Sequence, residues 1–274
     1  MIQDILPQVF HNNFSNRSPV QDDFILIFTG NQMYFMKEQN SLIFPRYSEV
    51  KDDINNVIYL FSIDQQSYFL SMDYKGDMEQ KLVAENISIF REYKPSYMAF
   101  AGITGSQIYR WYCNNKFCGK CGKPTIHSLR ERALLCDDCN HVIYPKISPA
   151  VIVAVYDGNR LLLSKNAHGD YKRYALIAGF VEIGETLEET VKREVMEEVG
   201  LKVKNIKYYK TQPWSFSDTL LVGYTAQLDG NNEITLDTNE LSEAVWMERE
   251  EIPEDDIHIS LTRELMEAFR NHKF

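Results

Sequence analysis

Three glutamates in the segment 187–199 are spaced so that they could bind metal ions together. Glu194 and Glu198 are four residues apart, and Glu197 lies between them. On a helix, residues three or four apart share a face, and like charges at that spacing repel one another. A cation would remove the repulsion, and clustered carboxylate oxygens suit Mg²⁺ or Mn²⁺. The pattern predicts a catalytic metal site; a solvated acidic face held by salt bridges is the alternative.

The same segment carries the signals of an amphipathic helix. Thr186 and Glu189 form a capping box at its start, and Gly200 stands where a helix commonly ends in a left-handed residue. Arg193 is spaced to pair with Glu189 or Glu197. A buried stripe is predicted from the apolar residues Leu187, Val191, Val195 and Val199. Before the helix, 150–156 reads as a buried strand that turns at Asp157-Gly158 into 161–163.

Two Cys-x-x-Cys pairs predict a second metal site of a different kind. The pairs are Cys118 with Cys121 and Cys136 with Cys139, separated by residues 122–135. Four thiolates from two tight turns match the tetrahedral site of a structural Zn²⁺, which leaves no open position for catalysis. The alternatives are redox pairs or plain buried thiols. Cys113 is expected to be an ordinary thiol, and His127 and His141 are weaker candidate ligands.

The order of residues around the carboxylates resembles one family motif in full. The motif reads Gly-x5-Glu-x7-Arg-Glu-U-x-Glu-Glu-x-Gly-U, with U aliphatic, and is the Nudix box. Its fixed places are filled by Gly179, Glu185, Arg193, Glu194, Val195, Glu197, Glu198, Gly200 and Leu201. The resemblance implies an α/β/α sandwich around a mixed sheet. It implies metal binding by Glu194, Glu198 and the backbone carbonyl of Ala178, and a base role for Glu197.

A second motif narrows the resemblance to the bacterial NADH pyrophosphatases among the Nudix hydrolases. These enzymes carry a zinc ribbon before the catalytic domain and the marker Ser-Gln-Pro-Trp-Pro-Phe-Pro-x-Ser. Here Thr211 replaces the first serine, and the marker continues as Gln212, Pro213, Trp214, Ser215, Phe216, Ser217, Asp218 and Thr219. Serines replace two prolines, which relaxes the loop and puts its rigidity in doubt. A packed loop with a buried Trp is the alternative.

Other substrate and metal positions follow from the resemblance one at a time. Tyr144 and Phe180 match aromatic residues that stack on the dinucleotide, and core packing is their alternative. Glu240 matches a later metal ligand. The remaining substrate contacts are predicted at Glu131, at Thr262, where the family has alanine, and at Arg91, where the alignment is uncertain by about two residues.

Composition bounds the class of protein. The 274 residues are 44% hydrophobic and 25% charged, which predicts a globular protein of about two domains plus a small module. The net charge of -10 argues against a general nucleic-acid binder, although basic residues outnumber acidic ones between 110 and 146. The longest apolar runs are too short to span a membrane, and residues 1–10, with Asp4 and no basic residue, are not expected to act as a signal peptide. We therefore expect a cytoplasmic protein with no membrane partner.

The chain before the ribbon is expected to be rich in β-strands. Short apolar runs predict strands at 24–28, 34–36, 57–61 and 68–70, with turns at Gly30-Asn31 and Gln65-Gln66. Pro95 opens a predicted helix that runs to about Tyr112. The predicted domains are a β-rich domain over 1–112, the zinc ribbon over 113–146 and the Nudix domain over 147–274. The resemblance implies a homodimer with the site near the subunit junction.

The predicted activity is metal-dependent cleavage of NADH or NAD⁺ between its two phosphates, giving NMN(H) and AMP. No Gly-x-Gly-x-x-Gly fingerprint follows a strand, so NAD(H) is expected as a substrate to be cut. One alternative is removal of NAD caps from RNA by the same chemistry. Another is a non-catalytic regulator that senses nucleotides or binds nucleic acid, although the complete Arg193-Glu194 and Glu197-Glu198 pairs argue against it.

Overall fold

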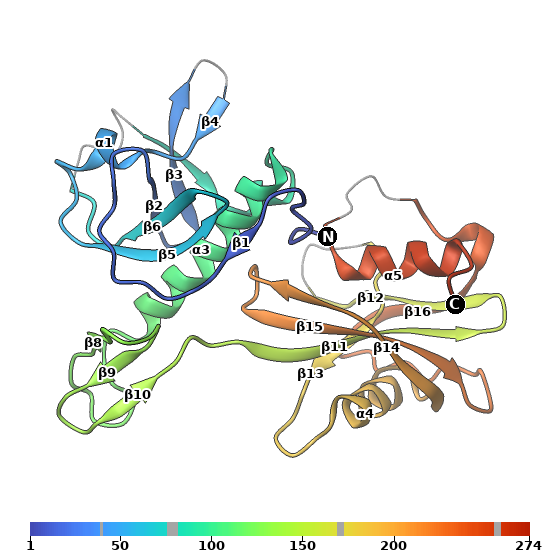
Figure 1. The fold of residues 1–274 in the computed structure, drawn as a ribbon. Helices are drawn as coiled ribbons and strands as arrows, with labels where there is room; N and C mark the ends of the chain where they lie inside the picture. Colours follow the sequence, from blue (N-terminus) through green and yellow to red (C-terminus); the bar gives the residue numbers. More distant parts are fainter. Residues whose placement is uncertain (39–40, 76–81, 169–172, 255–258) are drawn as a thin grey trace. The chain divides into compact units, whose positions relative to one another are not determined.

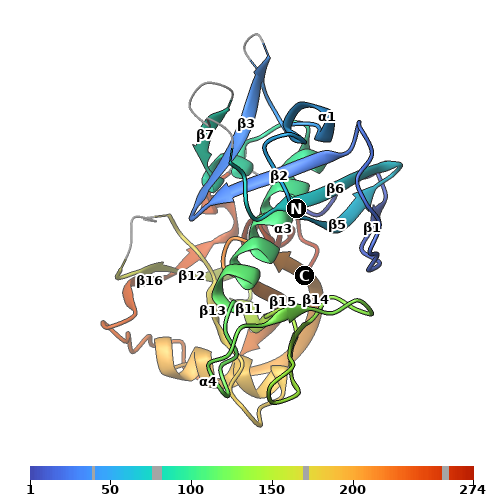
Figure 2. The same ribbon diagram turned by 90° about the vertical axis from the view of Figure 1, so that its left-hand side faces the viewer.

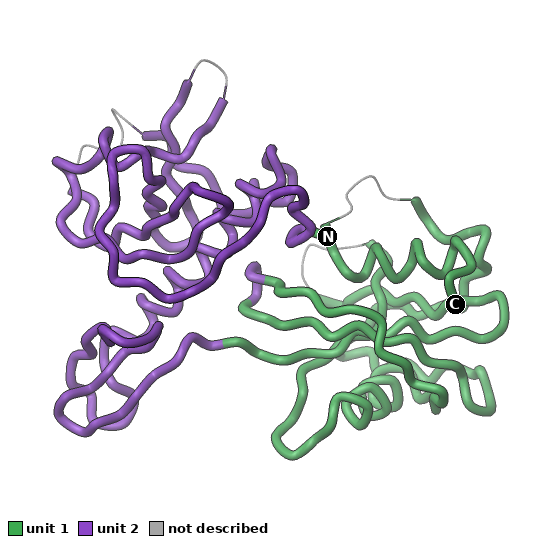
Figure 3. Tube along the Cα trace, in the orientation of Figure 1, with its two compact units in different colours: residues 1, 147–214, 218–274 green, residues 2–146, 215–217 purple. Residues whose placement is uncertain are grey.

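The computed structural model describes residues 1–38, 41–75, 82–168, 173–254 and 259–274. It divides into two compact units, shown in Figure 3. One comprises Met1, 147–214 and 218–274; the other comprises 2–146 together with 215–217. The predicted β-rich domain and zinc ribbon thus lie in one compact unit. Within the described residues, none of the helices has the length and hydropathy needed to cross a bilayer.

The unit of residues 147–274 is a sandwich with one sheet between two helices (Figure 1). Its described strands run in the order β14-β15-β11-β12-β16, and β13 pairs with β11. β11 and β15 are parallel and the other pairs are antiparallel, so the sheet is mixed as expected. The strands are β11 (Ser148–Asp157), β12 (Arg160–Asn166), β13 (Ile177–Phe180), β14 (Val203–Trp214), β15 (Thr219–Leu228) and β16 (Leu241–Glu248).

Alternation along β11 explains how one strand supports both helices. Val151, Val153 and Val155 pack with the buried valines of α4 (Leu187–Val199). Ile152 and Ala154 point to the opposite core, which α5 (Leu261–Arg270) covers. Because side chains alternate between the faces of a strand, a continuous apolar run is required where both faces are covered. The α/β/α sandwich predicted from the family resemblance is therefore confirmed. The short η2 (Arg249–Glu251) follows β16.

The residues predicted to begin and end α4 do so in the structure. Thr186 Oγ1 accepts a hydrogen bond from the Glu189 backbone N–H at 3.2 Å, and Glu189 Oε2 accepts one from the Thr186 N–H at 2.8 Å. The helix ends at Gly200, whose φ is +69. Glycine adopts this left-handed conformation readily because it has no Cβ. The predicted capping box and C-terminus are both confirmed.

The other unit is built on a seven-stranded sheet within the described residues, in the order β1-β5-β6-β2-β3-β4 with β7 beside β3. The four strands predicted before the ribbon are found as β2, β3, β5 and β6, and the predicted turn at Gly30-Asn31 is confirmed. The second turn lies at Asp64-Gln65, one residue before its predicted place, because Gln66 already pairs with Ile63 in the sheet. The elements are β1 (Phe10–His11), β2 (Phe24–Thr29), β3 (Gln32–Glu38), β4 (Ser41–Ile43), α1 (Tyr47–Val50), β5 (Val57–Ile63), β6 (Gln66–Ser71), β7 (Val83–Asn86) and η1 (Ile87–Arg91).

Helix α3 (Ser96–Asn114) packs on β2, β5 and β6 and continues two residues past the predicted end at Tyr112 (Figure 2). Two of its glycines permit this close approach. A Cβ at Gly102 would lie 2.1 Å from the Phe90 ring, and one at Gly105 would lie 2.3 Å from Leu26. The ribbon follows with β8 (Ile126–His127), β9 (Leu134–Cys136) and β10 (His141–Ile143), paired in the order β10-β9-β8.

We expect Gly102→Ala to destabilise the protein by about 1 kcal/mol. Alanine favours a helix by ~1 kcal/mol over glycine, but the Cβ would overlap the Phe90 ring, and overpacking costs about 1–3 kcal/mol. Urea unfolding of both proteins measures the difference. Gly119→Ala is the control, since a Cβ there meets nothing within 4 Å. A Gly102→Ala protein as stable as wild type would contradict the packing argument.

Candidate active site and metal centres

Arg193 is the centre of the charge network on α4. Its Nε and Nη2 donate to the two carboxylate oxygens of Glu185 at 2.6 and 3.0 Å. Its Nη1 donates to Glu194 at 2.8 Å and to Glu197 at 2.9 Å, and Nη2 also reaches the Phe180 carbonyl at 2.9 Å. Such a two-pronged contact is the strongest geometry for an arginine and a carboxylate. Of the two partners expected from spacing, Glu197 is found, while Glu189 is used in the helix cap.

The network separates two kinds of glutamate electrostatically. The Arg193 guanidinium lowers the pKa of Glu185 to about 2. Burial raises the pKa of Glu194, against the opposing effect of Arg193. Burial raises the pKa of Glu198 to about 8, and the neighbouring carboxylates of Glu194 and Glu240 add to that shift. Arg193 therefore compensates the negative charge of Glu194 and Glu197. Glu198 receives no such compensation and is repelled by the neighbouring carboxylates.

Gly179 allows Glu194 to reach the sheet. A Cβ at this position would lie 1.9 Å from Cδ of Glu194 and 2.0 Å from its Oε1. Glu194 thus occupies the space beside β13 that any other residue at 179 would fill. This contact explains the fixed glycine at the head of the motif.

Four of the predicted site residues line one cavity of about 390 Å³. They are Ala178 from β13, Glu198 from α4, Glu240 before β16 and Thr262 from α5. Glu198 is 5% exposed, and in the described part of the chain no group donates a hydrogen bond to its carboxylate. A buried carboxylate without a cationic partner is costly unless it is protonated or binds a metal. The two carboxylates of Glu198 and Glu240 in this cavity fit a hard divalent cation, and the predicted ligand role of the Ala178 carbonyl stays a prediction.

Three further polar residues line the same cavity and carry no signal in the sequence: Asn166, His168 and Asn239. They come from the end of β12, the segment after it and the turn before β16, so only the tertiary structure brings them together. Glu197 stands apart, 59% exposed, and Phe180 is also exposed at the end of β13. Over the described residues, only the four cysteines place three or more ligand atoms within 4.8 Å of one another, so the carboxylates are more widely spaced.

The Gln212–Thr219 motif forms the end of a hairpin. Gln212, Pro213 and Trp214 end β14, Thr219 begins β15, and Asp218 turns the chain with φ +59. The Gln212 side chain is fully buried; it donates to the Ile259 carbonyl at 2.8 Å and accepts from the Leu261 N–H at 2.7 Å. The structure thus gives Gln212 a positioning role at the start of α5, and its predicted substrate contact stays a prediction.

The tip of the hairpin, 215–217, belongs to the unit of residues 2–146. Ser215 is buried and its carbonyl accepts a hydrogen bond from Arg110. The Arg91 guanidinium lies 4.4 Å from the centre of the Phe216 ring. Both contacts fix a tip that lacks the family's prolines. The predicted roles of Arg91, Phe216, Ser217 and their neighbours toward a substrate stay predictions.

The ribbon brings together two other predicted residues and all four metal cysteines. The Tyr144 hydroxyl donates to Glu131 at 3.2 Å, and this bond raises the pKa of Tyr144. The cysteine sulfurs lie within 4.8 Å of one another, with Cys118–Cys139 at 3.6 Å and Cys121–Cys136 at 3.4 Å. Cys113, His127 and His141 are not in this group. A compact group of four thiols fits a tetrahedral metal site.

The chain matches two family models over adjacent regions. Residues 146–269 match the NUDIX domain, and residues 114–144 match the NADH pyrophosphatase zinc ribbon domain. Curated relatives include the proteins named NAD-capped RNA hydrolase NudC from Citrobacter koseri and from Salmonella heidelberg. Each is 43% identical over 149 residues, which are 54% of this chain and 58% of the relative. The chain thus matches less than two thirds of these relatives.

Among solved structures, a NUDIX hydrolase from Nitrosomonas europaea is similar at a TM-score of 0.50. It is 25% identical, and the match covers 58% of this chain and 92% of that one. This likeness supports the fold of the sandwich described above.

We expect Gly179→Ala to weaken binding of Mn²⁺ at least tenfold with little loss of fold. The added Cβ would displace the Glu194 carboxylate, and a misplaced ligand lowers metal affinity. Titration followed by Mn²⁺ electron paramagnetic resonance measures the affinity. Gly184→Ala serves as the control, because a Cβ there meets nothing within 4 Å, although its φ of +97 adds local strain. Equal affinities in wild type and Gly179→Ala would contradict this role.

The stability of the protein without added divalent cations should depend on the protonation of Glu198. Its pKa in the fold, about 8, is raised above that of an unfolded glutamate, so its stabilising contribution is present below about pH 4.5 and is lost as the pH rises to about 8. Glu198→Gln removes this dependence. At pH 8.5 the variant should be more stable than wild type by on the order of 2–4 kcal/mol, and the difference should shrink toward pH 5.

Urea unfolding from pH 5 to 9 without added divalent cations tests this prediction. Added Mg²⁺ should restore the stability of wild type at high pH and leave Glu198→Gln nearly unchanged. Parallel stability curves for the two proteins would show that Glu198 does not titrate in this range.

Proposed function

We propose that this chain, which carries a Nudix domain and an NADH pyrophosphatase zinc ribbon, cleaves NADH or NAD⁺ into NMN(H) and AMP. The observation that carries the proposal is the buried Glu198 carboxylate. It lines a cavity with Glu240 and Ala178 and has no cationic partner among the described residues. Such a site suits a divalent cation and a phosphate-bearing substrate.

Glu194, Glu198, Glu240 and the Ala178 carbonyl are the residues that would hold Mg²⁺ or Mn²⁺. When bound, these ions neutralise the phosphoryl oxygens and activate the attacking water. The protein's own contribution is to place the carboxylates. Gly179 admits Glu194 against β13, and Arg193 fixes Glu194 and Glu197 through bonds of 2.8 and 2.9 Å. Arg193 is thus a positioning residue.

Glu197 is the proposed base. Its exposed carboxylate can take a proton from the water that attacks phosphorus. The new bond joins the water oxygen to one phosphorus, the bridging P–O bond breaks, and its electrons stay on the departing phosphate. Tyr144, Phe180 and Glu131 are the proposed contacts to the rest of the dinucleotide, and exposed rings at 144 and 180 can stack on its bases.

Removal of NAD caps from RNA is a second candidate for the same chemistry. The observation that favours it is the name of the curated relatives, which are called NAD-capped RNA hydrolases. A cap presents the same dinucleotide, so the cleaved bond is unchanged. Whether free NADH or capped RNA is the better substrate follows from their kcat/KM ratio.

Three further proposals accompany the activity. The four converging thiols support a structural Zn²⁺ in the ribbon. Reduced thiols of this kind also support a cytoplasmic location. The family resemblance supports a homodimer, which sedimentation of the purified protein would test.

We expect Glu198→Gln to lower kcat/KM for NADH by about a hundredfold or more with Mg²⁺ or Mn²⁺, because an amide is a poor ligand for these cations. Chromatography of NMNH and AMP measures the rate. Glu188→Gln, an exposed glutamate on the same helix, should keep activity within about twofold.

The substrate panel separates the hypotheses. Wild-type cleavage of ADP-ribose or diadenosine compounds without NADH would retain the hydrolase and exclude the NADH assignment. No cleavage of any dinucleotide or capped RNA would leave the non-catalytic regulator.

A further inference from the structure

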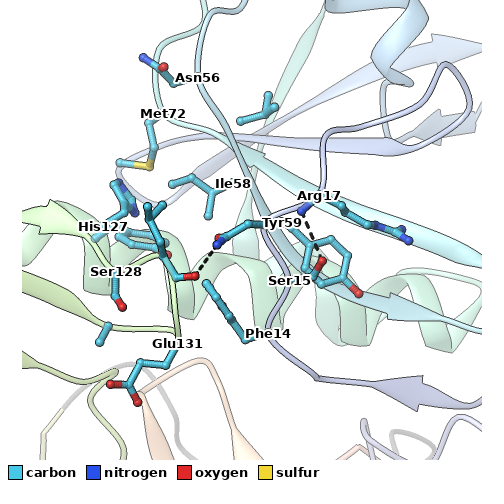
Figure 4. A pocket seen from close by; sticks show the side chains of 15 residues that line it. Phe14, Ser15, Arg17, Asn56, Ile58, Tyr59, Met72, His127, Ser128 and Glu131 are labelled. Carbon is cyan, nitrogen blue, oxygen red and sulfur yellow. Dashed lines mark hydrogen bonds between the residues drawn. The ribbon is translucent and has the colours of Figure 1, made fainter.

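A second cavity, of about 540 Å³, lies wholly within the unit of residues 2–146. It opens between strand β5, the segment 14–17 and the ribbon segment 127–133 (Figure 4). Its size falls within the range of small-molecule sites, about 300–1,000 Å³. It is separate from the cavity that contains Glu198.

Aromatic rings line much of this cavity. Tyr59 and Tyr112 are 9% and 6% exposed, and Phe14 and His127 stand beside them. The Tyr112 and His127 rings lie 4.9 Å apart at 45°. Burial lowers the pKa of His127, so its imidazole is neutral at pH 7 and offers one donor and one acceptor. Rings of this kind stack on planar heterocycles.

The rim adds hydrogen-bonding groups with unused capacity. Asn16 donates to the Leu129 carbonyl, Asn56 donates to Asp73 at 3.2 Å, and Glu131 accepts from Tyr144 through Oε1. Within the described residues, no group bonds to the amide oxygen of Asn16 or Asn56, or to Oε2 of Glu131. These oxygens are acceptors for the hydroxyl or amino groups of a ligand.

Charge and polarity exclude two other classes of ligand. Arg17 is the one arginine or lysine among the described residues that line the cavity, and its guanidinium lies 4.8 Å over the Tyr59 ring. With Glu131 at the rim, the cavity is poorly suited to a cluster of phosphates. A purely apolar ligand would bury the free oxygens without partners, which is unfavourable.

We propose that this cavity binds a nucleoside moiety, with the base against the aromatic rings and the ribose hydroxyls toward the free oxygens of Asn16, Asn56 and Glu131. The moiety comes either from a free nucleoside or from the nucleotide that follows the dinucleotide in a capped RNA. The first source is independent of the proposed hydrolase activity, and the second rests on it.

The test uses the full chain with adenosine as the probe, followed by calorimetry. Ile58 lines the cavity on β5, so Ile58→Trp should fill it, while Ile58→Val keeps the space and is the matched control. We expect wild type and Ile58→Val to bind adenosine with Kd values within about twofold. Ile58→Trp should bind at least tenfold more weakly, and its NADH turnover should stay within twofold of wild type.

Asn56→Ala provides a second variant, because Asn56 is exposed and its loss should not disturb folding. It should weaken adenosine binding about threefold to tenfold. Comparison of NADH with an NAD-capped RNA one nucleotide longer identifies the source. A KM raised by Ile58→Trp for the longer substrate alone assigns the cavity to RNA, and equal KM values with lost adenosine binding assign it to a free nucleoside.

The proposal is overturned if wild type binds no adenosine and Ile58→Trp leaves the KM of the longer substrate unchanged. It is also overturned if adenosine binds equally to wild type, Ile58→Trp and Asn56→Ala. If wild type does not turn over NADH, the proposed hydrolase activity is refuted. The adenosine measurement remains valid in that case, so the two failures are distinguishable.

Discussion

The burial of several carboxylates beside one arginine is the constraint on which the Nudix unit depends. Glu194 and Glu198 are 8% and 5% exposed, and their repulsion would oppose folding if nothing compensated it. Arg193 compensates the Glu185, Glu194 and Glu197 end of the cluster, and Gly179 supplies the space for Glu194. Glu198 is left with a raised pKa, facing a cavity. The compensation is therefore incomplete at the position where a divalent cation would act.

The sandwich holds these carboxylates in place because the apolar stripe of α4 packs against the sheet. Val191, Val195 and Val199 are completely buried, so the opposite side of the helix is held at one rotation relative to β13. The capping box and Gly200 fix the two ends of the same helix. The space for the carboxylates is narrow, since a single Cβ at position 179 would overlap the carboxylate of Glu194. Packing on one face thus determines electrostatics on the other.

Much of this could be predicted from the sequence because the signals are local. The capping box, the valine stripe, the spacing of Glu194 and Glu198, and the two Cys-x-x-Cys pairs each depend on residues within a few turns of one another. A continuous apolar run likewise predicts β11, and the turn predicted at Asp157-Gly158 lies one residue further on, at Gly158-Asn159, since Asp157 still pairs with Arg160. Side-chain partners that are further apart in the sequence are harder to predict. Arg193 was expected to bind Glu189 or Glu197, and its principal partner is Glu185, eight residues away across the loop that precedes the helix.

The sequence by itself determined the motif, the metal-ligating residue types and the alternation that covers both faces of the sheet. Only the tertiary structure decided which distant residues share a cavity. His168 and Asn239 line the same cavity as Glu198 because β12 ends beside the start of β16, where Asn166 pairs with Leu241. The Gln212 side chain bonds to the backbone at the start of α5. The hairpin tip 215–217 packs with Arg91 and Arg110, more than a hundred residues earlier. The physical reason is that periodicity and capping act through neighbouring residues, whereas burial and long-range pairing depend on how completed elements pack.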